Sequence, residues 1–254
     1  VDQWYDTEST GGKFVRKDSS FRDWITRDGK IDDETRKAYP AEAGRYHLYV
    51  SLACPWAARA LMVRKLKGLE DIVGLSIVSP LMYDKGWSFG DYPGATEDKV
   101  HGFKYLHELY THAKADYTGR VTVPVLYDTV EEKIVNNESS EIIRIFNHAF
   151  DHLGAKEGDF YPEELRSEID EINEVVYDRI NNGVYKAGFA TKQEVYGEEA
   201  KNVFAALDKI EEIFKDIFNA EDALVRTSIV SGTHAIYIML SSVLNHGDEF
   251  IYVT

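Results

Sequence analysis

The chain has 254 residues, of which 44% are apolar, and a net charge of −15. Such a chain can bury one large or two modest cores. An acidic surface is a poor partner for phosphate backbones or anionic membranes, so we expect no nucleic-acid binding. We find no apolar run of about 18 residues, which predicts no membrane span. The first residues lack the apolar core of a secretory signal.

Residues 1–44 are polar but carry spaced aromatic side chains, among them Trp4, Tyr5, Phe14 and Trp24. This pattern predicts an extended N-terminal arm whose aromatic rings dock on the main domain. That the arm helps to wall an active site remains the alternative.

The most informative stretch surrounds Cys54. Residues 46–50 form an apolar run typical of a strand, residues 57–66 have the composition of a helix, and a second strand is predicted over residues 72–78. Together they predict a βαβ unit of the thioredoxin type. Pro55 suits the first helical position, so Cys54 is expected at the helix N-terminus, where free N–H groups and the helix dipole favour a thiolate.

Cys54 is the only cysteine in the chain, and the position of a second thioredoxin cysteine holds Ala57. No disulfide can form within the chain, which fits a reducing, cytoplasmic compartment. If Cys54 takes part in a catalytic cycle through a mixed disulfide, an external thiol must resolve that disulfide. Glutathione is the abundant candidate. The alternative is a small buried cysteine without reactivity.

Between the second strand and the next predicted helix, residues 81–100 are expected to form a loop that holds Trp87. The helix, predicted over residues 103–113, contains His107 and His112, which nearly match an HExxH zinc motif. Because these histidines are five residues apart, a helix separates them by about 140°. We therefore predict no zinc binding by this pair.

Residues 121–128 are typical of a strand but contain Pro124, which is unwelcome in a paired strand. A cis peptide before Pro124 would resolve the conflict and leave backbone groups facing outward. A strand at 133–136 and a helix opening at residues 137–141 complete the order of a thioredoxin-like domain, predicted over residues 45–150.

An all-α domain is predicted to begin after a linker at residues 151–160 and to run to about residue 210. It is expected to hold helices over residues 162–181 and 192–218, joined by a loop at residues 182–189. The fold class is thus an α/β thioredoxin-like domain followed by an all-α domain.

Glutathione carries two carboxylates and an ammonium group, so its site needs cations, hydrogen-bond donors and a carboxylate. Arg120 can meet a carboxylate, and Glu138 with Ser139 opens a helix whose N–H groups bind anions. The simpler interpretations are a surface charge at Arg120 and helix capping at Glu138 and Ser139.

Four motifs, at residues 45–57, 122–128, 136–141 and 181–189, together resemble the Xi-class glutathione transferases, the glutathionyl-hydroquinone reductases. The resemblance runs over about residues 1–210. It implies a homodimeric enzyme that removes glutathione from glutathionyl-hydroquinones through a mixed disulfide on Cys54. Such an enzyme would use glutathione as substrate and reductant and would need no metal.

By motif position, the resemblance implies a set of contacts to glutathione and one to the quinone. The expected glutathione-binding residues are Trp87, Arg120, Val123, Glu138 and Ser139, and Tyr185 is expected to line the quinone pocket. Where the family usually has histidine this chain has Ala58, which predicts weakened reactivity of Cys54. A glutathione-conjugating transferase and a non-catalytic glutathione-binding relative remain alternatives.

Residues 211–254 depart from this family. They resemble a fragment of a methionine gamma-lyase-like, aluminium-resistance-type pyridoxal-phosphate enzyme, with residues 231–233 at the place of a phosphate-binding loop. This indicates a chimaera joined near residues 210–214, and a diverged C-terminal domain is the alternative. We expect no pyridoxal phosphate binding, because a large domain with a Schiff-base lysine is also required.

Overall fold

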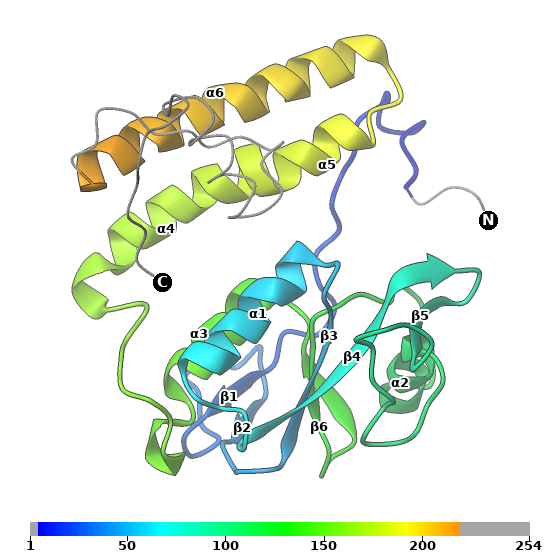
Figure 1. Cartoon of the computed structure of the whole chain (residues 1–254), viewed down its shortest axis with the longest axis vertical. Coiled ribbons are helices and arrows are strands. Elements are labelled where there is room, and N and C mark those ends of the chain that lie inside the picture. Colours follow the sequence, from blue (N-terminus) through cyan, green and yellow to red (C-terminus); the bar gives the residue numbers. More distant parts are fainter. Residues whose placement is uncertain (1–4, 219–254) are drawn as a thin grey trace, which may run out of the picture. The chain divides into compact units, whose positions relative to one another are not determined.

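The computed structural model describes residues 5–218, with 1–4 and 219–254 outside that range (Figure 1). The chain divides into two compact units. The first, which we call the sheet unit, is formed by residues 18–166. The second, the helical unit, holds the described residues 5–17 and 167–218. The predicted N-terminal arm, residues 1–44, is therefore divided between the two, and Trp4 and the tail residues 231–233 lie outside the described residues.

The sheet unit is built on a five-stranded mixed sheet of order β5-β4-β3-β6-β7. The central strand β3 (Tyr46–Ser51) is buried along its whole length. It pairs in parallel with β4 (Val73–Tyr83) and antiparallel with β6 (Val125–Asp128). The edge strands β5 (Gly86–Phe89) and β7 (Lys133–Asn136) pair antiparallel with β4 and β6. This arrangement confirms the predicted thioredoxin-like fold class.

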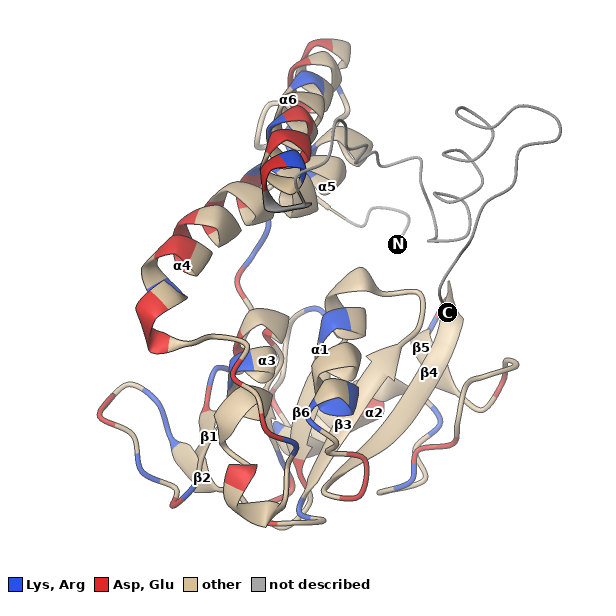
Figure 2. Cartoon of the chain, turned by 60° about the vertical axis from the view of Figure 1, so that its left-hand side comes forward, with Lys and Arg blue, Asp and Glu red and all other residues tan. Residues whose placement is uncertain are grey.

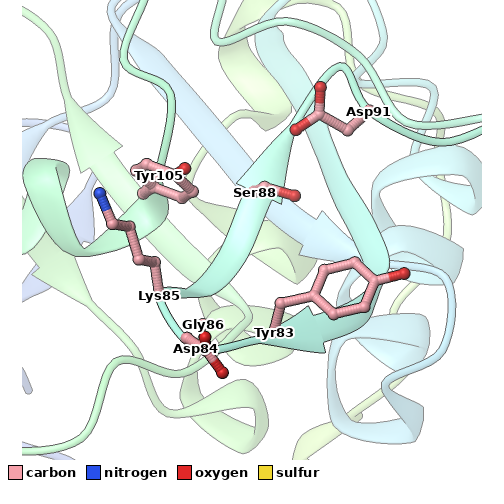
Figure 3. A pocket seen from close by; sticks show the side chains of 7 residues that line it. All are labelled: Tyr83, Asp84, Lys85, Gly86, Ser88, Asp91 and Tyr105. Carbon is pink, nitrogen blue, oxygen red and sulfur yellow. The ribbon is translucent and has the colours of Figure 1, made fainter.

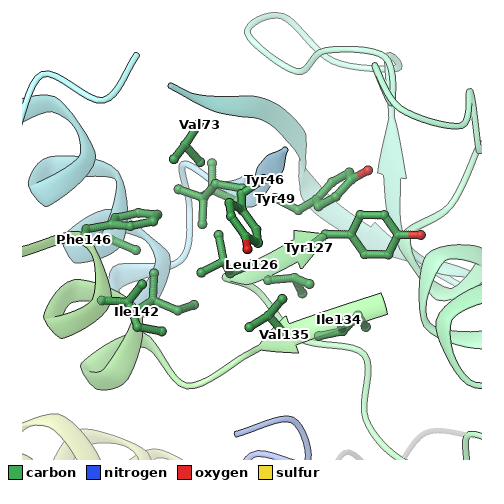
Figure 4. Packing of buried hydrophobic residues seen from close by; sticks show 14 of the residues in the cluster. Tyr46, Tyr49, Val73, Leu126, Tyr127, Ile134, Val135, Ile142 and Phe146 are labelled. Carbon is green, nitrogen blue, oxygen red and sulfur yellow. The ribbon is translucent and has the colours of Figure 1, made fainter. Parts of the chain in front are cut away.

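Helices cover both faces of this sheet. α1 (Pro55–Leu66) and α3 (Ser139–His148) lie side by side on one face, and α2 (Leu106–Ala113) packs on the other (Figure 1). Figure 4 shows the resulting core, with Ile142 and Phe146 of α3 facing the sheet from one side and Tyr127 turned to the other. Burial of large apolar side chains on both faces is the main stabilising contribution.

Part of the predicted arm is built into the sheet unit. β1 (Trp24–Thr26) and β2 (Ala38–Pro40) form a small parallel sheet, and Arg22 forms an antiparallel bridge with Asn136 of β7. The ring of Phe21 stacks on Tyr117 with centroids 5.6 Å apart. The predicted docking of arm aromatics on the main domain is thus observed for Phe21.

Three predicted elements in the sheet unit were wrong in extent. The helix predicted over residues 103–113 begins only at Leu106. Residues 81–100 are not all loop, because β4 continues to Tyr83 and turns into β5 at Gly86, whose φ of +76° suits glycine. The strand predicted over residues 121–128 begins only at Val125. The Val123–Pro124 peptide is cis, as predicted, and proline has no N–H to donate to a neighbouring strand.

After two short 3₁₀ turns, η1 (Asp151–Leu153) and η2 (Glu163–Leu165), the chain is helical. α4 (Arg166–Val175) runs through a π-helical segment, η3 (Val176–Asn181), into α5 (Asn182–Gly188).

The loop predicted at residues 182–189 is therefore wrong. A Cβ atom at Gly183 would lie 2.7 Å from Cγ2 of Val203, so the glycine permits close packing of α5 on α6.

The last described helix, α6 (Gln193–Phe218), begins one residue after the predicted start. The predicted junction at residues 210–214 lies inside α6, which continues through it without interruption. Among the charged residues of α4 and α6, Asp and Glu outnumber Lys and Arg (Figure 2). None of the helices within residues 5–218 combines the length and the apolar character that crossing a membrane requires.

Candidate active site

The backbone at Cys54 has the predicted geometry. Cys54 is the N-cap residue of α1, with extended angles φ −97° and ψ 113°, and Pro55 occupies the first helical position. The Cys54 N–H donates to the carbonyl of Ser51 at 3.1 Å, and the Ala58 N–H donates to the carbonyl of Cys54 at 3.0 Å. The cysteine side chain does not cap the helix, so the sulfur lies at the positive end of the helix dipole without a capping role.

The thiol is partly exposed and lies beside the cis-proline segment. Its Sγ donates to the carbonyl oxygen of Val123 at 3.5 Å. Because Val123 lies two residues before β6, the pairing of β3 with β6 brings the two segments together. An accessible sulfur next to backbone pairing groups is suited to bind the cysteinyl portion of a peptide thiol.

Glu138 and Ser139 begin α3, as predicted. Glu138 is the N-cap residue, and its Oε1 accepts a hydrogen bond from the Ser140 N–H at 3.1 Å. Its other oxygen accepts from the Ser19 hydroxyl at 3.0 Å. The capping role that the sequence left open for Glu138 is therefore present, and it orients the carboxylate at the helix start.

Arg59 connects the helix of the cysteine to the start of α3. Its guanidinium donates to the Ser139 hydroxyl oxygen from Nε at 3.0 Å and from Nη2 at 2.8 Å, and it lies 3.7 Å from Glu138 Oε1. With its oxygen accepting from arginine, Ser139 keeps its O–H proton for donation. The same guanidinium lies over the Trp56 ring, 5.1 Å from its centroid.

Sequence reasoning missed Arg59. A signal was present, because a cation near a helix N-terminus is unfavourable with the dipole unless another group compensates it. Glu138, 79 positions further along the chain, supplies that compensation.

The remaining predicted residues lie on other segments. Trp87 is on β5, partly buried against the core, and Arg120 is exposed in the segment before β6. Tyr185 belongs to α5 of the helical unit, where its ring stacks with Phe14 at 6.0 Å and lies beneath the Arg16 guanidinium at 4.6 Å. The structure thus brings the Cys54 thiol to the Val123 carbonyl, and Arg59 contacts both Glu138 and Ser139. Tyr185 belongs to the helical unit.

A hollow of about 290 Å³ lies elsewhere, on the β4–β5 hairpin (Figure 3). Its lining includes Tyr83, Lys85, Asp91 and Tyr105. None of the predicted site residues lines it, so we place the candidate active site at Cys54 instead.

Comparison with known proteins agrees with this fold. The family model described as glutathione S-transferase, N-terminal domain, matches residues 53–149. The chain is 57% identical over 213 residues to glutathionyl-hydroquinone reductase YqjG of Escherichia coli, which covers 84% of this chain and 65% of the relative. It is 40% identical to glutathione S-transferase omega-like 2 of Saccharomyces cerevisiae, over 85% of this chain and 69% of the relative.

A solved structure of glutathione-bound YqjG, described as a glutathione transferase homolog, superposes with a TM-score of 0.75 at 55% identity. The match covers 78% of this chain and 64% of that one. The crystal structure of glutathione S-transferase Xi from Phanerochaete chrysosporium superposes with a TM-score of 0.76 at 49% identity, over 82% and 65% of the two chains. The thioredoxin-like sheet, the cysteine at the start of α1 and these matches together indicate a glutathione transferase.

The chain belongs to the glutathione S-transferase family, and within that family to the Xi class. It spans about 65% of the length of its E. coli relative.

The C-terminal part has a second likeness. The family model described as methionine gamma-lyase matches residues 164–254. The match confirms the predicted resemblance of the tail but begins well before residue 211, so it includes α4, α5 and α6.

Proposed function

We propose that this protein is a glutathione-dependent reductase that removes glutathione from glutathionyl-hydroquinones. The observation that carries the proposal is the partly exposed Cys54 at the N-terminus of α1, beside the Val123 carbonyl. The name of the E. coli relative, glutathionyl-hydroquinone reductase, supports the substrate class.

The proposed reaction has two steps. The Cys54 thiolate attacks the sulfur of the glutathionyl group, so that an S–S bond forms and the aromatic C–S bond breaks. The electron pair of the broken bond goes to the ring carbon, which takes a proton and becomes part of the free hydroquinone. A second glutathione thiolate then attacks the mixed disulfide, which yields glutathione disulfide and restores the Cys54 thiolate.

Residues of the sheet unit supply groups of the kind that glutathione needs. We propose that the backbone at Val123 pairs with the cysteinyl portion, while Glu138 meets the ammonium group and Ser139 donates to a carboxylate. The cis-proline segment and the α3 N-terminus support these roles. Trp87 and Arg120 complete the proposed set, with Arg120 as the cation for a second carboxylate.

The remaining roles follow from the class. We propose that Tyr185 lines the quinone pocket, since a phenol ring can stack on an aromatic acceptor and donate to a leaving oxygen. A homodimer in the cytoplasm is proposed as well, and a single cysteine fits a reducing compartment. Light scattering of the purified chain tests the dimer, with twice the monomer mass expected.

The first test uses intact mass spectrometry after incubation with glutathione disulfide. We expect one glutathionyl adduct, located on Cys54 and removed by reduced glutathione. Turnover of glutathionyl-menadione should fall at least 1,000-fold in Cys54→Ala, because the nucleophile is lost. A wild-type protein without adduct and without turnover would reduce the proposal to glutathione binding alone. Conjugation of an electrophile that persists in Cys54→Ala would favour the transferase alternative.

Arg59 offers a test of the binding geometry. Arg59→Met keeps the length of the side chain but removes both hydrogen bonds to Ser139. We expect KM for glutathione to rise about tenfold, the cost of one charge-assisted hydrogen bond, with a smaller change in kcat. The matched control is Arg144→Met on α3, whose guanidinium lies over the Tyr161 ring.

Ala58 tests the influence of the residue that departs from the family. Ala58 is partly buried one turn into α1, and its N–H bonds the Cys54 carbonyl. We expect Ala58→His to speed alkylation of Cys54 by iodoacetamide near neutral pH. An unchanged rate profile would show that Ala58 does not limit the thiol.

A further inference from the structure

Three metal-binding side chains from separate segments meet in the sheet unit. His101 lies before α2, His112 is in the last turn of α2, and Glu132 is in the turn between β6 and β7. One ligand atom of each lies within 4.8 Å of the other two. Cys54, Val123, Glu138 and Ser139 are not members of this cluster.

Two contacts orient the His101 ring within the cluster. His101 Nε2 is hydrogen-bonded to the Tyr127 hydroxyl at 2.9 Å, so its Nδ1 is the nitrogen left for a metal ion. Such a hydrogen bond to the second ring nitrogen is the usual way in which a metal-binding histidine is oriented. The His101 ring also stacks on Phe103, with centroids 4.8 Å apart.

The other two ligands already face each other. His112 Nε2 lies 3.6 Å from the Glu132 carboxylate, and the rings of His101 and His112 are 4.7 Å apart. Glu132 has a φ of +53°, a left-handed conformation that is uncommon for residues other than glycine. This backbone conformation belongs to the turn that places Glu132 beside His112.

We propose that His101, His112 and Glu132 form a zinc-binding site. Two imidazoles and one carboxylate are a common protein ligand set for Zn²⁺, with water at the fourth position. Donor atoms around a tetrahedral zinc ion lie about 3.4 Å apart, as bond lengths near 2.1 Å require. The cluster must therefore close by about 1 Å. His112 and Glu132 are exposed and can make this movement by side-chain rotation.

Zinc at this site would connect the segment before α2, the end of α2 and the β6–β7 turn. An ion that binds the folded chain and not the unfolded one raises the unfolding temperature. The site thus acts as a stabilising clip on the sheet unit, and it has no part in the chemistry at Cys54.

The test is calorimetric titration of the full-length chain with ZnCl₂. It is done in a Cys54→Ser background, because a thiolate also binds zinc. We expect one equivalent to bind, with His112→Ala and Glu132→Gln each lowering the affinity at least tenfold. Tyr127→Phe, which removes only the hydroxyl that orients His101, should also weaken binding about tenfold.

His107→Ala is the matched control, since His107 is also on α2 but bonds the Lys85 carbonyl instead. It should bind zinc as the parent does. Absence of binding at 1 mM ZnCl₂, used here as a roughly saturating level for any physiological site, would overturn the proposal. The proposal would also be overturned if His112→Ala and Glu132→Gln bound zinc with the affinity of the parent. Their circular dichroism spectra must match that of the parent, which shows that both variants are folded. Substitution with Co²⁺ gives an independent readout, because a histidine-ligated tetrahedral ion has visible absorption bands that Glu132→Gln should alter.

Discussion

The sheet unit and the helical unit bury their apolar residues very differently. In the sheet unit, Leu48 and Leu126 are completely buried, and the strands are covered on both faces. In the described part of the helical unit, Val203 and Leu207 are buried between helices, but Phe204 remains 49% exposed. Both regions have clear secondary structure, so regular local structure does not by itself produce a closed core.

The difference follows from how each element finds partners. β3 is flanked by two strands and covered by helices, whereas α4 and α6 carry apolar residues on faces that the described residues leave exposed. These exposed residues include Ile172, Tyr196 and Phe214. Apolar burial stabilises in proportion to the area removed from water, so most of the stability should reside in the sheet unit.

Removing a buried side chain from the sheet should have the largest effect. Leu126→Ala deletes a completely buried side chain from β6 and should lower the free energy of unfolding by about 2–5 kcal/mol. Urea unfolding followed by tryptophan fluorescence is the measurement, because Trp24, Trp56 and Trp87 all belong to the sheet unit. A loss below about 1 kcal/mol would contradict the view that this core dominates stability.

Acidification should weaken the same unit through His47. Burial lowers the pKa of His47 to about 4, and its Nε2 is hydrogen-bonded to the Ser76 hydroxyl at 2.8 Å. The unfolded chain, with a pKa near 6.5, binds the proton more tightly, so stability falls as pH drops from about 6.5 to 4. The loss should be on the order of 3 kcal/mol.

Urea titrations across that pH range measure the loss. In His47→Gln the slope of stability against pH should flatten between pH 6.5 and 4, the range set by the two pKa values. An unchanged slope would assign the acid sensitivity to another group.

Glu141 should act at lower pH. Burial alone would raise the pKa of Glu141, but hydrogen bonds from Arg22, Asn136 and Arg36 outweigh it and hold this pKa below 4.5. Its contribution is present above pH 4.5 and is lost as pH falls through the lowered value. Glu141→Gln should cost about 1–2 kcal/mol at neutral pH and remove this acid-dependent part. Equal acid sensitivity in the variant and the parent would count against this cluster.

The smallest effect is expected on the exposed face of α6. Phe204→Gln replaces a half-exposed ring and should change the free energy of unfolding by less than about 0.5 kcal/mol. The comparison between the two units would fail if this change cost as much as Leu126→Ala.

Local sequence was sufficient where the signal lies in neighbouring residues. Pro55 after Cys54 predicted the start of α1, and Pro124 inside an apolar run predicted the cis peptide. Proline limits the backbone whatever surrounds it, so these inferences did not depend on tertiary structure. The same holds for β7, whose limits agree with the predicted ones, and for the start of α3, which lies within the predicted opening at residues 137–141.

Tertiary structure alone decided the features that join distant segments. Residues 182–188, predicted as part of a loop, form a helix in which Gly183 packs closely against Val203. Arg59 was not among the predicted site residues, and its hydrogen bonds to Ser139 bridge 80 positions of sequence. His112 failed as the partner of His107 and instead meets His101 and Glu132. Steric limits act within a few residues and can be read locally, whereas side-chain partners depend on which surfaces the folded chain brings into contact.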